Sequence, residues 1–217
     1  MTDASTSPLA MFPLGRPCLP GELLPLRIFE PRYLSMLRDL LATPDPQFGV
    51  VLIDRGSEVG GGDVRRSIGT SVAVVSIEEV APNQFGLVII GRERIRILQW
   101  LDDDPYPRAL VEDWPAPIYI GADDPDSSGD RLGQLFDSDS LKHVPLEQKL
   151  FTLASMLPIG ALDLQSLLEA DSVRAQRSVM EEILHHLEDL ARFDDQPTNR
   201  HRSTWQTSDC LLEIGGG

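Results

Sequence analysis

The segment PGELLPLRIFEPRY, residues 20–33, limits the possible fold more than any other part of the chain. It places a largely apolar run of strand length, Leu23–Ile28, between the Pro20-Gly21 pair and a later proline, Pro31. Proline is tolerated at the first position of a helix, because the N–H there has no partner within the helix. The segment therefore predicts a short strand that passes almost directly into a helix beginning at Pro31.

The residues after Pro31 follow a helical period. Apolar side chains recur at i, i+3, i+4, i+7 and i+8, as on one face of an amphipathic helix. They belong to Tyr33, Met36, Leu37, Leu40 and Leu41. The sequence TPDP at residues 43–46 is expected to end this helix.

Short runs rich in apolar and β-branched residues lie around this helix, and glycine or proline separates them. The predicted strands are 9–14, 23–28, 48–53, 67–80, 85–90, an alternating segment beyond Gly91, and 108–114. Residues 54–66 are predicted to form a turn-rich loop, and Gly91 is predicted to interrupt a strand. Six or seven short strands with glycine corners favour a closed or half-closed barrel with one packed helix. The predicted class is α+β.

Two positions within these strands carry specific expectations. Gly69 lies inside the run 67–80, where glycine often marks a close backbone approach or a kink. Arg94 and Arg96 alternate with Ile95 and Ile97, so the two arginines share one face of their strand. We expect that face to be solvated.

The composition changes after Trp114, and the pattern becomes helical from about residue 131. We predict a barrel-like subdomain at 9–118, an acidic linker at 119–130, a helical subdomain at 131–193 and a flexible tail at 194–217. Pro145 is expected to open one helix and Asp163 to cap a short second one. Asp171 or Ser172 is expected to cap a longer third helix.

Charge and hydropathy exclude several classes of partner. The net charge is −15, only two of the basic residues are lysines, and residues 101–140 hold 11 acidic residues against 2 basic ones. Nucleic-acid binding and anionic membranes both favour basic surfaces, so neither partner is expected. No apolar stretch approaches the ~20 residues that cross a bilayer. The polar N-terminus does not resemble a signal peptide, so a cytoplasmic location and free thiols at Cys18 and Cys210 are expected.

The residues that could carry chemistry have structural explanations. Cys18 has no histidine near it in the sequence, which favours an inert thiol. His185 and His186 are adjacent on a predicted helix and point about 100° apart, so they do not share one metal. Gly60–Gly62 leads into a strand and not a helix, which favours a hairpin turn over a phosphate loop. No catalytic residue, metal or cofactor is predicted.

Several separated motifs together resemble the N-terminal domain of Lon proteases, over about residues 11–190. They are FPLG (12–15), the 20–33 segment, FGVVLI (48–53), EVGGG (58–62), IGT (68–70) and GRERI (91–95). The resemblance implies the substrate-recognition module of an ATP-dependent protease, here in free-standing form. It also implies a PUA-like pseudo-barrel, of a type shared with RNA-binding barrels, followed by a helical subdomain.

What the resemblance implies is binding and not proteolysis. No G-x-x-x-x-G-K-[ST] loop occurs in these residues, so the ATPase signature is missing, and a peptidase module is not expected. We predict a non-catalytic module that binds unfolded or specific protein clients. The alternatives are an adaptor or regulator of an ATP-dependent protease, with that protease as its partner, or a nucleic-acid-binding PUA-like module.

The predicted peptide groove lies between barrel and helices. Its candidate residues are Pro20, Gly21, Glu22, Glu30, Arg32 and Tyr33. The last three of these residues also have a structural interpretation, which the pattern favours. Tyr33 belongs to the core face of the helix, Glu30 favours the helix dipole, and Arg32 can form an ion pair with Glu30 or Glu93.

Overall fold

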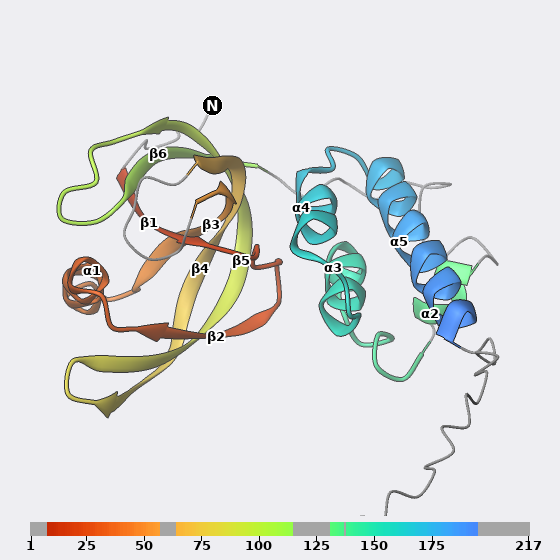
Figure 1. The fold of residues 1–217 in the computed structure, drawn as a ribbon, viewed down its shortest axis with the longest axis horizontal. Coiled ribbons are helices and arrows are strands. Elements are labelled where there is room, and N and C mark those ends of the chain that lie inside the picture. Colours follow the sequence, from red (N-terminus) through yellow and green to blue (C-terminus); the bar gives the residue numbers. More distant parts are fainter. Residues whose placement is uncertain (1–7, 57–63, 115–130, 137, 195–217) are drawn as a thin grey trace, which may run out of the picture.

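The computed structural model describes residues 8–56, 64–114, 131–136 and 138–194, which form a barrel beside a group of helices (Figure 1). The strands in these ranges are β1 (Pro8–Leu14), β2 (Leu23–Ile28), β3 (Gln47–Arg55), β4 (Val64–Ala81), β5 (Gln84–Trp100) and β6 (Arg108–Asp113). The helices are α1 (Pro31–Leu41), α2 (Arg131–Phe136), α3 (Leu146–Met156), α4 (Ala161–Glu169) and α5 (Val173–Asp194). The predicted α+β class is confirmed.

The barrel closes through the long strand β5. One edge of β5 pairs with β4. The other edge pairs with β2 over residues 85–90 and with β6 over residues 95–100. β6 then pairs with β1, β1 runs parallel to β3, and β3 returns to β4. Among the described strands β2 has one neighbour, β5, so it stands beside the closed ring as an edge strand.

Helix α1 begins at Pro31 as predicted and packs on the barrel on the side away from α3–α5 (Figure 1). Of its predicted apolar face, all but Leu41 are buried in the barrel core with Phe12 and Phe48. Leu41, at the end of the helix, is 50% exposed. A second core lies among the helices and includes Phe136, Phe151 and Met180.

Strand β5 runs through Gly91 without a break, which corrects the predicted interruption there. The glycine is needed for a different reason. The loop before β2 approaches so closely that a Cβ at Gly91 would lie 2.0 Å from the carbonyl oxygen of Leu19. The Gly91 N–H donates to the carbonyl of Glu22, and the Gly91 carbonyl accepts from the N–H of Gly21, both at 2.9 Å. Gly91 therefore joins the loop to the barrel wall.

The barrel and the helices are connected through Arg94, which is 2% exposed. Its Nη1 donates to the carbonyl oxygens of Leu168 and Ala170, at 2.8 and 2.7 Å, where α4 ends. The expectation of a solvated face was therefore wrong for Arg94, because α4 packs on that face and offers its unpaired C-terminal carbonyls as acceptors. Arg96, on the same face, is 41% exposed and pairs with Glu112.

Other boundaries differ from the predictions in small ways. β4 begins at Val64, within the predicted 54–66 loop, while Gly60–Gly62 lies outside the described residues. α4 has Gly160 at its N-cap, and Asp163 lies in its first turn instead of capping it. Ser172 Oγ accepts from the N–H of Ala175 at 3.2 Å and caps α5, as predicted. The predicted 119–130 linker and residues 195–217 lie outside the described ranges, and the subdomain boundaries stay predictions.

Candidate functional site

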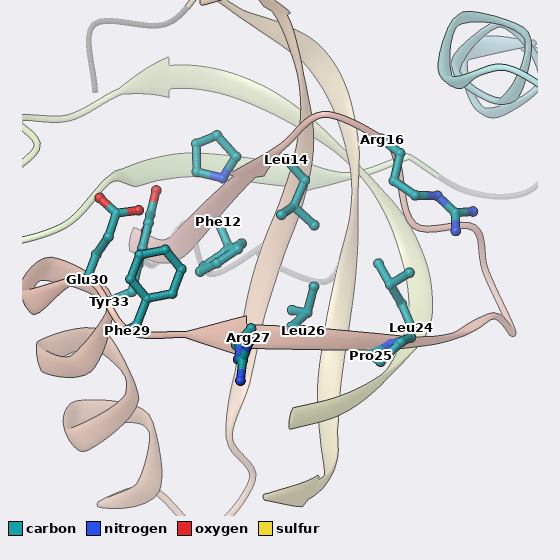
Figure 2. A pocket seen from close by; sticks show the side chains of 11 residues that line it. Phe12, Leu14, Arg16, Leu24, Pro25, Leu26, Arg27, Phe29, Glu30 and Tyr33 are labelled. Carbon is teal, nitrogen blue, oxygen red and sulfur yellow. The ribbon is translucent and has the colours of Figure 1, made fainter. Parts of the chain in front are cut away.

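A groove lies between β1 and β2, two strands that pass each other without pairing. β1 uses its two edges for β3 and β6, and β2 uses one edge for β5. The groove has a volume of about 310 Å³, and its wall at one end comes from the start of α1 (Figure 2). It is lined by Phe12, Pro13, Leu14, Arg16, Leu24, Pro25, Leu26, Arg27, Phe29, Glu30 and Tyr33.

Apolar side chains dominate this groove. Phe12 and Leu14 from β1 face Leu24 and Leu26 from β2 across it (Figure 2). Phe29, in the two-residue link between β2 and α1, is 49% exposed although it is a large aromatic residue. A half-exposed aromatic at the rim of an apolar groove is typical of a surface that binds another molecule.

Charged side chains stand at the ends of the groove. Arg16 lies at the end nearer the helices, Glu30 lies at the α1 end, and Arg27 lies between them on β2 (Figure 2). Side chains of both signs in these positions can orient a bound chain by its charges, while the apolar middle provides contact area.

The backbone of β2 is the second component of the site. An edge strand presents N–H and C=O groups that another strand can pair with. Pro25 sits in the middle of β2. Proline is largely confined to edge strands, because each residue of a central strand donates its N–H to a neighbouring strand and proline has no N–H. Pro25 thus fits an edge position and removes one donor from the edge.

At the α1 end the structure brings together three of the predicted site residues. The Arg32 Nε lies 3.2 Å from Glu30 Oε2, and the Arg32 guanidinium lies 4.4 Å from the centroid of the Tyr33 ring. Tyr33 is 2% exposed and its ring packs on Phe12, with 4.2 Å between centroids. Glu30 and Tyr33 line the groove, and Arg32 supports them from outside it.

The other three predicted residues lie at the far end of β2, next to the helices. A six-residue strand separates them from Glu30 by about 20 Å. Pro20 is buried, and Gly21 has φ +80° and sits against Gln148 of α3. The Glu22 side chain is only 8% exposed; it accepts from the Leu19 N–H at 2.9 Å and from Arg16 at 2.6 Å.

Sequence reasoning missed most of the residues that line the groove. From the sequence, Phe12, Leu24 and Leu26 are all interpreted as ordinary residues of short strands. The one available signal was Phe29. It follows the strand pattern of β2, precedes the helical face of α1, and belongs to neither apolar pattern.

Other reactive side chains have inert surroundings. Burial, together with the nearby Glu22 carboxylate, raises the pKa of the Cys18 thiol to about 12, although Arg16 acts in the opposite direction. His185 Nε2 lies 3.4 Å from Asp189 on its own helix. In the described ranges no group of three or more His, Cys, Asp or Glu side chains could hold a metal ion. None of the described helices is long and apolar enough to span a membrane.

About half of this chain is similar in sequence to known Lon proteases. Lon protease 2 of Sorangium cellulosum is 29% identical over 113 residues, which make up 51% of this chain and 14% of that protein. Lon protease of Syntrophus aciditrophicus is 28% identical over 123 residues, covering 54% of this chain and 15% of that protein. The chain therefore spans only a small part of the length of the curated relatives that it matches.

Two solved structures share the fold. A Lon N-terminal domain protein from Xanthomonas campestris aligns with a TM-score of 0.61 at 26% identity, over 82% of this chain and 98% of that one. The N-terminal domain of a Mycobacterium avium complex Lon protease aligns with a TM-score of 0.57 at 15% identity, over 81% of this chain and 97% of that one. The family model for the substrate-binding domain of ATP-dependent protease La (Lon) matches residues 8–149, more than half of the chain, and the protein belongs to that family.

Proposed function

We propose that this protein is a non-catalytic module that binds extended, apolar segments of unfolded protein clients in the groove between β1 and β2. The observation that carries the proposal is the combination of an apolar groove with a strand, β2, whose outer edge pairs with none of the described strands. The family, defined by a substrate-binding domain, supports a recognition role.

An extended peptide fits this site by strand addition. Its backbone would pair with the outer edge of β2, about 4.8 Å away, and alternate side chains would point into the groove. β2 has six residues, so a client segment of about that length would match it. Phe12, Leu14 and Phe29 would contact the client side chains. The groove discriminates against folded proteins, because their apolar segments are already buried and their strands are already paired.

The candidate residues take different parts in this proposal. Glu30 and Tyr33 form the wall at the α1 end, and Arg32 holds Glu30 in place through their ion pair. Pro20, Gly21 and Glu22 shape the loop from which β2 begins, at the other end. We propose that this second group acts on the peptide indirectly, through the position of Arg16.

The test is fluorescence anisotropy with labelled apolar peptides of eight to ten residues. Phe29→Asp is expected to weaken binding about tenfold, or ~1.4 kcal/mol, which is less than the ~1.5–3 kcal/mol gained by burying a whole phenylalanine side chain. The fold should be retained, because Phe29 is already 49% exposed. Leu162→Asp is the matched control, since Leu162 is 63% exposed on α4 and does not line the groove.

Equal affinity of the Phe29→Asp and Leu162→Asp variants would show that the groove is not the peptide site. If the wild-type protein retains no peptide but binds an intact ATP-dependent protease, the adaptor or regulator function replaces this proposal. The net charge of −15 supports protein clients over nucleic acid. We also propose a cytoplasmic location, where such clients would be met.

A further inference from the structure

We propose that a second groove, between α4 and α5, is a docking site for a basic amphipathic helix of a partner protein. The groove has a volume of about 480 Å³ and is formed with the Pro158–Gly160 turn that precedes α4. Its floor is apolar and includes Val179, Ile183 and Leu187 of α5. α4 and α5 lie apart from β1 and β2 (Figure 1), and this groove shares no lining residue with the groove between β1 and β2.

The apolar stripe of α5 continues beyond the helices that cover it. Met180, Ile183 and Leu184 are buried, Leu187 is half-buried, and Leu190 is 52% exposed. α5 has 22 residues and α4 has 9, so α5 is about 33 Å long and α4 about 13 Å. The exposed end of this stripe is an apolar surface that a further helix could cover.

The charges around the groove select the kind of partner. Three other carboxylates of α5 have basic neighbours: Glu181 pairs with Arg177, and Glu188 and Asp189 pair with Arg192. The two carboxylates that line the groove are Asp163 and Glu182.

For these two carboxylates the structure records no ion pair with any described residue. None of the described residues that line the groove is a lysine or an arginine, and His186 is the one imidazole among them. An unneutralised acidic rim over an apolar floor therefore complements a ligand that is apolar on one side and carries Lys or Arg at its edges.

The walls of the groove favour a helix over an extended strand. The backbone groups in the interior of α4 and α5 are bonded within each helix, so they offer no edge to which a strand could add. Val179, Ile183 and Leu187 are spaced by four residues and form a ridge along α5. Ridges of this kind pack into the grooves of another helix. A partner with apolar residues at i, i+3, i+4 and i+7, flanked by basic residues, fits both the shape and the charge.

The test uses the full chain and labelled synthetic 16-residue peptides at about 0.15 M salt, where the Debye length is roughly 8 Å. One peptide has a leucine face and lysine flanks, a second replaces each lysine with glutamate, and a third scrambles the leucine positions of the first. Fluorescence anisotropy should show binding of the leucine–lysine peptide. The glutamate and scrambled peptides should each bind at least about tenfold more weakly, because one loses charge complementarity and the other loses the apolar face.

Glu182→Lys and Glu181→Lys form a matched pair of variants. Both change the net charge by the same amount at neighbouring exposed positions of α5, but only Glu182 lines the groove. Glu182→Lys should weaken binding of the leucine–lysine peptide by roughly tenfold, and Glu181→Lys by no more than about twofold. Phe29→Asp should leave this binding unchanged, which separates it from the proposed client site.

Three results would overturn the proposal: no binding of the leucine–lysine peptide, equal binding of the lysine and glutamate peptides, or equal weakening by Glu182→Lys and Glu181→Lys. The last result would mean that the peptide responds to the overall negative charge and not to this groove.

Discussion

Replacing Gly69 by alanine should destabilise the barrel strongly, because no space exists for a side chain there. Gly69 lies in β4, between β3 and β5, opposite Val51 on one side and Ile95 on the other. A Cβ at this position would lie 2.3 Å from the carbonyl oxygen of Val50 and 3.3 Å from its carbonyl carbon. Both atoms belong to the backbone of β3, so they cannot rotate away as the end of a side chain can.

The expected cost follows from this geometry. An ordinary carbon–oxygen contact needs roughly an ångström more than the available distance, so β3 and β4 must move apart locally. Overpacking of this kind costs about 1–3 kcal/mol, and a weakened backbone hydrogen bond adds about 1 kcal/mol. We expect Gly69→Ala to lower the free energy of unfolding by about 3 kcal/mol, which for a protein of this size lowers Tm by roughly 6–12 °C. Gly69→Val, with two further methyl groups, should lose more.

Thermal unfolding followed by circular dichroism measures this effect, and Gly86→Ala is the matched control. Gly86 also lies in a strand, β5, but a Cβ there would meet only Val80 Cγ1, at an ordinary 3.5 Å. Gly86→Ala should therefore melt close to the wild-type protein or slightly above it, because alanine reduces the entropy of the unfolded chain. If the two alanine variants melt within two degrees of each other, the close approach at Gly69 does not limit stability.

Two further perturbations test the contact of Arg94 between the barrel and the helices, and the buried thiol of Cys18. Arg94→Met should lower the free energy of unfolding by about 3 kcal/mol, because two charge-assisted hydrogen bonds to the end of α4 are lost. Arg92→Met is the control: this side chain is 49% exposed, so the free energy of unfolding should change by less than ~0.5 kcal/mol. If urea denaturation gave equal losses for the two variants, Arg94 would not hold the barrel and the helices together. Because burial raises the pKa of Cys18 from 9.0 to about 12, the folded state keeps a proton that the unfolded chain releases. Stability should therefore fall between about pH 9 and pH 12, and less steeply in Cys18→Ala; equal slopes would exclude the thiol as the cause.

Local signals in the sequence predicted the β2–α1 segment well. Pro31 fixes the start of α1, and the four buried residues of its face follow the helical period. Each of these features depends on neighbours within a few residues, so the sequence contains the whole pattern. The same holds for the Ser172 cap of α5, whose donor lies three residues away.

Features that depend on distant segments could not be predicted in this way. The alternation in β5 correctly predicted that Arg94 and Ile95 point to opposite faces of the strand, and Ile95 is buried in the barrel. It could not show that the end of α4, more than seventy residues later, covers Arg94. Gly91 is a similar case, since its glycine is required by the loop at Leu19 and not by any property of β5 itself.

The proposed client groove is a consequence of the length of β5. With 17 residues, β5 is long enough to hold β2 on the first part of one edge and β6 on the last part of the same edge. β6 then closes the barrel onto β1, so β2 must run past β1 without pairing. Any fold that divides one strand edge between two partners in this way leaves the outer edge of the first partner available. The open edge that the proposal assigns to clients therefore arises from the same pairing that closes the barrel.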